Sequence, residues 1–448
     1  MKKDSKSDEP HAGDQVESTD IDESATHQSS SFSDNARTLT RRTAIARAAQ
    51  IGGIAVLGNV SDAMAQIHSE APPLVNTLPD TSKALGTPGT VLGSRSPHAE
   101  VRRFLRSGRP WTSGTPHEEL LGTLTPSDLH FERHHAGVPE IDPRKYALLL
   151  HGMVERPTVF SLSDLQRYPS VTAVNFLECS GHYPDNPTAE TRPSRIAPLL
   201  SNSEWTGVPL RTLLEEVGMH ADARWLLAEG QDGSKLMRSI PIEKAWDDAM
   251  IAYGQNGESL RPEQGYPARL FNPGWEGNTC VKWLRRIEIT DRPVMSREET
   301  SRYTDDTGSG KFRQFSFVMH ARSLIIYPGY PEKIKPGFVD IQGIAWSGRG
   351  KIAQVEVSID DGRTWQFAQL QSPVLSKAFT RFQLPWQWDG TPTTIWSRAT
   401  DETGYVQPTM TEFKRSRGEM GYHENFTIGW TIKPGGNVVF RVQDWDAA

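Results

Sequence analysis

The chain is 448 residues long, which at roughly 100–200 residues per domain allows two or three domains. Its 49 Lys and Arg against 55 Asp and Glu give a net charge of -6, which provides no basis for a nucleic-acid partner. Two cysteines exclude a disulfide framework and a four-cysteine zinc site, and without a C-x-x-C-H motif we expect no covalently attached haem in this chain. No run of about 18 apolar residues occurs, so we expect no ordinary membrane-spanning helix and no membrane partner.

Residues 1–65 form an N-terminal region with two parts. Residues 1–38 hold nine acidic and four basic side chains but few apolar ones, so we expect this part to be disordered. Residues 39–47 read Leu-Thr-Arg-Arg-Thr-Ala-Ile-Ala-Arg and precede a mildly apolar run at 48–60, and Ala63-Met-Ala65 after it has the small-x-small pattern of a cleavage site. Two adjacent arginines before such a run resemble a twin-arginine export signal, which predicts a periplasmic protein cleaved after residue 65. The alternative for this segment is an amphipathic surface helix.

The rest of the chain divides into four regions by composition. Residues 66–127 are rich in Pro and Gly, which predicts an extended N-terminal arm. Residues 128–295 mix short strands and short helices, as in an α+β domain. Residues 296–315 are polar and contain Gly308-Ser-Gly310, which predicts a linker. Residues 316–448 show short alternating strands between turn signals, which predicts an immunoglobulin-like β-sandwich.

Hydrophobic alternation and stop signals predict the individual elements. The first domain is expected to contain strands at 146–150, 171–177 and 283–290, a helical turn at 163–167 capped by Ser161 or Ser163, and a helix at 210–217. The second is expected to contain strands at 352–359, 364–370, 379–386, 394–400 and 426–432, with a hairpin turn at 360–362.

Cys179 directly follows a hydrophobic strand, in the segment Asn175-Phe-Leu-Glu-Cys-Ser-Gly181. A lone cysteine is commonly a small buried hydrophobic residue. A thiolate is also a soft ligand for a metal, and one cysteine is enough where a cofactor supplies the other sulfurs. Composition leaves both readings open.

Two further segments carry clustered polar residues. Phe131-Glu-Arg-His-His135 is a candidate anion-binding segment, and its alternative is a solvated polar turn. Arg269 and Lys282 flank the glycine-rich stretch 272–278, where free N–H groups and two cations suit a phosphate. Neither common nucleotide-binding glycine motif is present, so this stretch does not indicate a nucleotide site.

Taken together, these segments resemble the sulfite oxidase family of molybdopterin enzymes, and within it the molybdenum subunits of sulfane dehydrogenases from the bacterial thiosulfate-oxidising system. The similar motifs keep the family's order from residue 95 to residue 445. They include Phe131-Glu-Arg-His-His, Phe176-Leu-Glu-Cys-Ser, Trp205-Thr-Gly-Val-Pro-Leu, Leu260-Arg-Pro-Glu-Gln-Gly-Tyr-Pro-Ala-Arg269, Pro273-Gly-Trp-Glu-Gly277, Val281-Lys-Trp-Leu-Arg-Arg-Ile287, Arg297-Glu-Glu-Thr-Ser-Arg-Tyr-Thr-Asp305 and, in the second domain, Trp346-Ser-Gly-Arg-Gly-Lys351 and Asp401-Glu-Thr-Gly-Tyr-Val-Gln-Pro408.

The resemblance implies a molybdenum–molybdopterin cofactor. Cys179 matches the cysteine that binds the metal, and the pterin dithiolene would supply two more sulfurs. Arg133 and His135 match residues that contact the pterin and line an anion pocket. Arg269 and Lys282 match the basic residues around the pterin phosphate.

The resemblance also implies a set of substrate-site residues. Tyr303 matches the active-site tyrosine, Trp205 an aromatic residue of the substrate pocket, and Arg417 the arginine that the second domain lends to the pocket. The alternatives are a core tyrosine, a core tryptophan and a solvated arginine. With Arg133, Arg417 would attract an oxyanion of sulfur, because guanidinium groups match its oxygens.

The implied reaction is oxidation of sulfite to sulfate, with the electrons passed to a c-type cytochrome. One alternative is a sulfane dehydrogenase subunit that oxidises carrier-bound sulfane sulfur, and others are a sulfoxide-reducing enzyme or an inactive binding subunit. The sequence departs from the family at Pro184, where sulfite oxidases place a pocket arginine, and Arg192 or Arg195 could replace it. Cys280 is expected to be buried and inert.

Partners follow from the same resemblance. We expect a homodimer formed through residues 316–448, or a heterotetramer that also contains a cytochrome subunit. Because this chain carries no haem-attachment motif, its electrons have to leave to a separate protein.

The export signal makes a direct prediction. Replacing both arginines, Arg41→Lys with Arg42→Lys, should leave an active, uncleaved precursor in the cytoplasm, because twin-arginine export moves folded proteins. Fractionation and activity assays measure this, with a gene that carries only silent codon changes as the control. Normal periplasmic activity in the double variant would show that another export route operates.

Overall fold

The computed structural model describes residues 85–106, 111–181, 187–306, 310–418 and 423–441. The predicted acidic segment, the export signal and Pro184 lie outside these residues. Among the described residues, none of the helices has the length and apolar character that a membrane span requires. Residues 85–103 contain no helix or strand, in line with the extended arm expected for this part of the chain.

The arm ends in a small antiparallel sheet that leads to the polar segment around Arg133. Its strands are β1 (Phe104–Leu105), β2 (Thr112–Gly114) and β3 (Glu132–Arg133), with β2 in the middle. Thr112 pairs with Arg133, so the arm holds this arginine in a strand.

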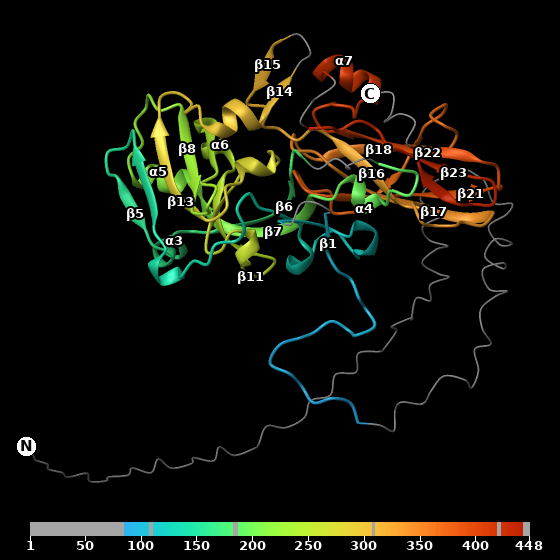
Figure 1. The fold of residues 1–448 in the computed structure, drawn as a ribbon, viewed down its shortest axis with the longest axis horizontal. Coiled ribbons are helices and arrows are strands. Elements are labelled where there is room, and N and C mark those ends of the chain that lie inside the picture. The colour runs from blue at the N-terminus through green and yellow to red at the C-terminus, as the bar shows by residue number, and fades with distance from the viewer. Residues whose placement is uncertain (1–84, 107–110, 182–186, 307–309, 419–422, 442–448) are drawn as a thin grey trace, which may run out of the picture. The chain divides into compact units, whose positions relative to one another are not determined.

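The first domain is built on two mixed-length sheets (Figure 1). One has the order β5-β4-β13-β8-β9, and its members are β4 (Leu148–Gly152), β5 (Thr158–Phe160), β8 (Trp225–Gly230), β9 (Met237–Pro241) and β13 (Leu284–Thr290). The other has the order β11-β10-β7-β6, with β12 also paired to β10, and its members are β6 (Val171–Glu178), β7 (Leu200–Pro209), β10 (Met250–Gln255), β11 (Glu258–Ser259) and β12 (Arg269–Phe271). The pair β4–β13 is parallel and the other pairs are antiparallel.

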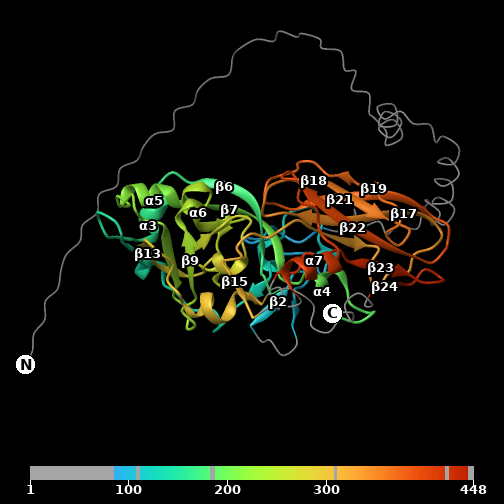
Figure 2. The same ribbon diagram turned by 90° about the horizontal axis from the view of Figure 1, so that it is seen from above.

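Short helices accompany these strands. They are α3 (Leu162–Arg167), α4 (Pro193–Ile196), α5 (Leu210–Glu216) and α6 (Ile242–Asp247). One of them, α4, packs against β16 (Arg322–Tyr327) of the second domain. Helices α5 and α6 lie side by side (Figure 2). Ser161 caps α3: its hydroxyl accepts from the Asp164 N–H at 3.1 Å, and the Asp164 carboxylate accepts from the Ser161 N–H at 3.0 Å. This reciprocal pair satisfies two backbone donors and begins the helix where the sequence predicted.

The second domain is a sandwich of two antiparallel sheets, which confirms the predicted immunoglobulin-like architecture. One sheet has the order β16-β17-β21-β20, with β16 (Arg322–Tyr327), β17 (Gly337–Trp346), β20 (Gln369–Leu370) and β21 (Thr380–Trp388). The other has the order β19-β18-β22-β23-β24, with β18 (Ile352–Ser358), β19 (Gln366–Phe367), β22 (Thr393–Asp401), β23 (Gly429–Ile432) and β24 (Val438–Phe440). Helix α7 (Met410–Arg417) lies between β22 and β23 in the chain.

The predicted return strand 364–370 needs a correction. The structure divides it into β19, which pairs with β18, and β20, which pairs with β21. The segment therefore completes the predicted hairpin through β19 and then crosses to the other sheet of the sandwich through β20.

The expected linker 296–315 also differs from the structure. It contains a π-helical turn at Glu298–Arg302 and a hairpin of β14 (Thr304–Asp306) with β15 (Phe312–Gln314). Glu298 and Glu299 are each only 2% exposed. A polar composition suggested solvation, but Glu299 is buried against Arg238 of β9, and Glu298 is buried with its neighbours Ser296 and Arg297 as partners.

His117, which follows β2, is a buried polar residue of the first domain. It is 2% exposed, and its Nε2–H donates to the Ala197 carbonyl at 2.9 Å. Burial lowers the pKa of His117 to about 4. The folded state therefore holds the neutral ring, whereas the unfolded state takes up a proton as the pH falls below the ordinary value of 6.5.

The buried ring predicts a specific loss of stability in acid. His117 stabilises the fold fully above pH 6.5, and this contribution is lost as the pH falls toward 4. In His117→Gln the loss should be smaller than in the wild type, by on the order of 3 kcal/mol at pH 4. Urea unfolding at several pH values measures it, and the exposed His220→Gln serves as the control. Parallel pH curves for His117→Gln and the wild type would contradict the prediction.

Candidate active site

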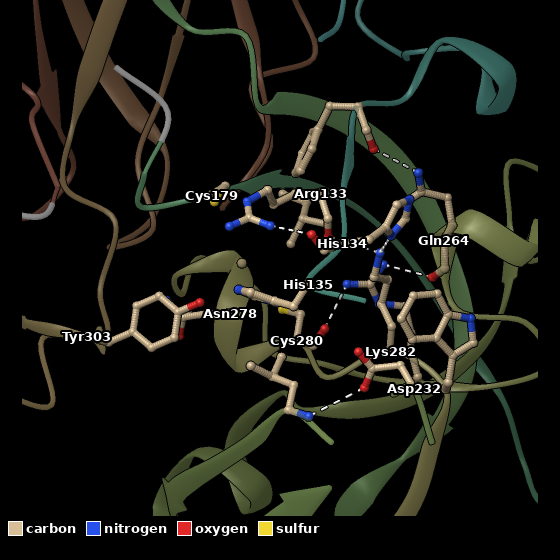
Figure 3. Close-up of a pocket in the computed structure, with 16 residues that line it drawn as sticks. Arg133, His134, His135, Cys179, Asp232, Gln264, Asn278, Cys280, Lys282 and Tyr303 are labelled. Carbon is tan, nitrogen blue, oxygen red and sulfur yellow. Dashed lines mark hydrogen bonds between the residues drawn. The ribbon is translucent and has the colours of Figure 1, made fainter. Parts of the chain in front are cut away.

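One cavity in the first domain collects most of the predicted site residues (Figure 3). Its lining comprises Phe131, Arg133, His134, His135, Leu177, Cys179, Asp232, Leu236, Gln264, Arg269, Gly277, Asn278, Cys280, Lys282, Trp283 and Tyr303. Six of the eight predicted residues are in this set. The other two, Trp205 and Arg417, are not.

Cys179 enters the cavity because it directly follows β6. Its N–H donates to the Leu199 carbonyl at 2.9 Å, and its side chain is half-buried. Burial raises the pKa of the Cys179 thiol, while the Arg133 guanidinium and the Gly181 N–H oppose this shift. The sulfur lies beside the Arg133 guanidinium in Figure 3. A nearby cation favours the thiolate, which is the form that binds metals.

Gly277 lets the opposite loop approach Cys179 closely. A Cβ atom at this position would lie 2.9 Å from the Glu178 carbonyl oxygen and 3.4 Å from the Cys179 Cα. The first distance is too short for a real Cβ contact, so a side chain here would move the loop away from the cysteine.

Lys282 forms the basic floor of the cavity. Its Nζ lies 2.7 Å from His134 Nδ1, 3.0 Å from the Glu263 carbonyl and 3.3 Å from the Arg133 carbonyl. Burial lowers the pKa of Lys282 well below its ordinary value, and the Arg269 charge acts in the same direction.

His134 connects this lysine to a carboxylate. Since its Nδ1 accepts from Lys282, its Nε2 carries the hydrogen and donates to Glu132 at 2.9 Å. Glu132 in turn pairs with Arg103 of the arm. A connected series of Arg103, Glu132, neutral His134 and Lys282 thus runs from the arm to the cavity.

His135 lines the same cavity, and the charges of two arginines act on its ring. Burial lowers its pKa to about 4, and the Arg133 and Arg302 charges add to this effect. The ring is therefore neutral near pH 7, so it can offer both a hydrogen-bond donor and an acceptor.

Arg269 on β12 is 2% exposed and has one unused donor. Its Nη1 donates to the Gln264 carbonyl at 3.0 Å and its Nη2 to the Cys280 carbonyl at 2.9 Å. Its buried Nε has no hydrogen-bond partner within the described parts of the chain. Burial lowers the pKa of Arg269 to about 10, so the group remains a cation at neutral pH. An unsatisfied buried cationic donor in a cavity wall suits a phosphate oxygen.

Trp205 lies behind this arginine instead of in the cavity lining. It is fully buried, it stacks on Phe271 with ring centroids 4.5 Å apart, and its indole N–H donates to the Asn175 carbonyl at 3.2 Å. The Arg269 guanidinium carbon lies 5.2 Å from the Trp205 ring centroid. The structure thus gives this tryptophan a supporting position under the basic wall, not the predicted position in a substrate pocket.

Arg417, at the end of α7, also lies outside the cavity lining. His320 Nδ1–H donates to the Val318 carbonyl at 3.0 Å, so His320 Nε2 accepts from Arg417 Nη2 at 3.1 Å. The charges of Asp305 and Glu276 act on this arginine, although burial still lowers its pKa. The structure therefore pairs Arg417 with His320 and does not place it in the cavity lining.

The two suggested replacements for the missing pocket arginine point elsewhere. Arg192 is exposed, and the Arg195 guanidinium carbon stacks 3.7 Å from the centre of the Phe104 ring in the arm. Neither of them lines the cavity.

Arg238 is a site residue that the sequence analysis missed. The side chain is 1% exposed, and its guanidinium carbon lies 4.8 Å from the Tyr303 ring centroid. Nε donates to Glu299 at 3.0 Å, and Nη1 donates to the Asn278 amide oxygen. The available signal was a charged residue inside the otherwise uncharged strand 237–241.

Asn278 extends this network to the neighbour of Cys179. Its Nδ2 donates to Ser180 Oγ at 3.1 Å and to Glu276 Oε2 at 2.8 Å. Burial raises the pKa of Glu276 to about 7, against the Arg238 charge and the Asn278 hydrogen bond. One hydrogen-bonded network therefore joins Arg238, whose guanidinium lies over the Tyr303 ring, to Ser180 beside Cys179.

Comparison with known proteins extends these observations to the whole chain. The oxidoreductase molybdopterin-binding domain family matches residues 135–298, and the Mo-co oxidoreductase dimerisation domain family matches residues 313–427. The solved structure of the sulfane dehydrogenase SoxCD from Paracoccus pantotrophus is 40% identical, with a TM-score of 0.78, over 83% of this chain and 98% of that chain.

Curated relatives are more distant. The sulfite oxidase of Gallus gallus is 29% identical over 68% of this chain and 72% of its own length. The NADH nitrate reductase of Ulva prolifera is 30% identical over 60% of this chain. This chain spans only 35% of that nitrate reductase.

The buried Arg238–Glu299 pair makes a prediction about stability. Arg238→Met should lower the free energy of unfolding by roughly 3–5 kcal/mol, because it leaves the Glu299 carboxylate buried without its cation. Urea unfolding followed by tryptophan fluorescence measures the change. Arg167→Met is the control: it breaks an exposed pair with Asp164 and should have little effect. Equal effects of the two substitutions would show that the buried pair contributes no more than a surface pair.

Proposed function

Because the chain belongs to the sulfite oxidase family of molybdopterin oxidoreductases, we propose that it oxidises a reduced inorganic sulfur compound at the cavity that contains Cys179. One observation carries the proposal. The cavity places Cys179 beside Arg133 and opens onto Lys282 and Tyr303, so a metal ligand, two cations and a phenol face one space.

The described residues fit a molybdopterin cofactor. Cys179 would bind the metal as a thiolate, and Gly277 leaves the space that a group beside the cysteine needs. The unsatisfied Nε of Arg269 and the ammonium of Lys282 would face the pterin phosphate. When bound, the molybdenum would supply two-electron oxygen-transfer chemistry.

The chain's own residues would then bind and orient the substrate. Arg133 would attract an anionic sulfur compound, and its planar guanidinium would fix the direction of the substrate oxygens. The phenol of Tyr303, held over Arg238, would donate or accept a proton at the substrate. His135 would remain neutral and contribute a hydrogen bond instead of a charge.

We propose sulfite as the substrate, oxidised to sulfate. A second candidate is carrier-bound sulfane sulfur, and a specific observation favours it: this chain matches the sulfane dehydrogenase structure over 98% of that chain. The position of Arg192 and Arg195 away from the cavity also leaves the pocket less cationic than the sulfite oxidase pattern requires.

We further propose a periplasmic homodimer that passes electrons to a c-type cytochrome. The twin-arginine motif supports the location, and the match to a dimerisation domain at 313–427 supports the dimer. The sulfane dehydrogenase relationship leaves a heterotetramer with a cytochrome subunit as the second form of the assembly.

The proposed function is tested by measuring which compound supplies electrons to cytochrome c. The purified full chain should contain molybdenum and reduce cytochrome c with sulfite as the electron donor. A parallel assay replaces sulfite with thiosulfate plus carrier proteins, and a separate assay supplies a reduced viologen dye as donor and measures the reduction of nitrate to nitrite. Reduction with carrier-bound sulfur alone would select the second candidate. The proposal would be overturned if none of these sulfur compounds supported cytochrome reduction and the protein turned over nitrate instead.

Cys179→Ser tests the metal ligand. We expect the pterin to remain bound, because Arg269 and Lys282 are unchanged, and turnover to fall below detection, because a hydroxyl is a poor substitute for a soft thiolate. Pterin fluorescence, metal analysis and cytochrome reduction measure the three quantities. Cys280→Ser is the matched control, since this thiol is buried and bonded to the Asn272 N–H at 3.3 Å. Wild-type turnover in Cys179→Ser would contradict the assignment.

A further inference from the structure

Glu178, the residue directly before Cys179, is fully buried and is bound by the second domain. Its Oε2 accepts from the Trp346 indole N–H at 2.7 Å, and its Oε1 lies 3.4 Å from Arg322 Nη1. Arg322 begins β16, Trp346 ends β17, and the two are direct cross-strand partners. Two neighbouring donors of the sandwich therefore converge on one carboxylate of the first domain.

The contact of Glu178 with Arg322 and Trp346 is buried from solvent. Arg322 is 2% exposed, and burial lowers its pKa while the Glu178 charge raises it. Hydrogen bonds from charged or indole donors to a buried carboxylate have fixed directions, and a buried ion pair adds less net stability than apolar residues of the same size. Two donors on neighbouring strands restrict where the Glu178 carboxylate can lie.

The second domain also holds the loop on the other side of Cys179. The Met319 N–H donates to the Gly274 carbonyl at 3.0 Å, and the Glu276 N–H donates to the Phe317 carbonyl at 2.7 Å. The Trp275 and Phe317 rings stack 4.5 Å apart with 4° between their planes. This loop continues into Gly277, which lies against Glu178 and Cys179.

We infer that the second domain, beyond any part in dimerisation, sets the position of Cys179, with Trp346 and Arg322 as positioning residues that act through Glu178. The inference rests on the proposed role of Cys179 as the metal ligand. Rotation of the Glu178 side chain would shift the backbone of the following residue, and a displacement of about 1 Å in a reacting group can lower a rate by about a hundredfold.

Two matched tryptophans of the sandwich allow a clean test. Trp346 and Trp430 are both fully buried, and each donates one indole hydrogen bond, to Glu178 at 2.7 Å and to the Ile325 carbonyl at 3.1 Å. Trp346→Phe and Trp430→Phe each remove one such bond from the same domain and leave an aromatic ring. Only the first of these bonds reaches the Cys179 segment.

In the full-length, metal-loaded protein we expect Trp346→Phe to lower kcat by about tenfold to a hundredfold with little change in KM, and Trp430→Phe to leave both near the wild-type values. The decisive second readout is the electron paramagnetic resonance spectrum of the one-electron-reduced metal, which reports the geometry of its sulfur ligand. It should shift in Trp346→Phe and not in Trp430→Phe, with the same dimer content in both.

Identical spectra and rates in the two variants would overturn the inference. If Trp346→Phe does not fold, Glu178→Gln decides, because it keeps the shape of the side chain but turns one acceptor toward Arg322 into a donor. It should shift the spectrum in the same way, and an unshifted spectrum overturns the inference. A Cys179→Ser protein with an unchanged spectrum would instead refute the proposed function.

Discussion

A carboxylate buried at the boundary of two domains is the constraint on which the site depends. Glu178 ends β6 and accepts from donors on β16 and β17, so the strand that leads into the cavity is fixed by a sheet that begins 144 residues later in the chain. An unpaired charge at this depth would be strongly unfavourable, so the sandwich and the first domain have to fold against each other for the strand to end where it does. The shape of the cavity is therefore a property of both domains.

Within the cavity, desolvation decides what the basic residues can do. Lys282 lies against three protein acceptors, and burial lowers its pKa, so it acts as a short-range donor more than as a long-range attractor. Arg269 keeps its charge and has one donor unused. Arg133 is half-buried, and its charge acts on the Cys179 thiol. The three basic residues thus differ in burial and in the hydrogen bonds that they make.

The sequence predicted those parts of the fold that local patterns determine. The alternation of residues 171–177 predicted the strand that precedes Cys179, and Ser161 and Ser163 were the two candidate caps of α3, of which Ser161 is the cap; both signals lie within a few residues of the element. The polar stretch 296–315 misled the prediction, because the cation that neutralises Glu299 is Arg238, 61 residues away.

The sequence predicted those site residues whose positions are determined by the motif in which they stand. Cys179, Arg133 and Tyr303 meet in one cavity, as the ordered motifs implied. Trp205 and Arg417 were assigned to the pocket from their place in a motif, but which way a side chain points depends on packing against distant strands. For Trp205 that packing is the stack on Phe271, which no local pattern encodes.

The contact between Gly274 and Gly348 has a consequence for how such chains can be recombined. A Cβ atom on Gly348 would lie 1.8 Å from the Gly274 carbonyl oxygen, and one on Gly274 would lie 2.5 Å from the Gly348 carbonyl oxygen. The backbone of each domain comes so close to the glycine of the other that no side chain fits there. The sequence of one domain alone therefore does not determine the interface. A chimera that joins this first domain to a sandwich from another protein has to keep glycine at both positions, however similar the two sandwiches are elsewhere.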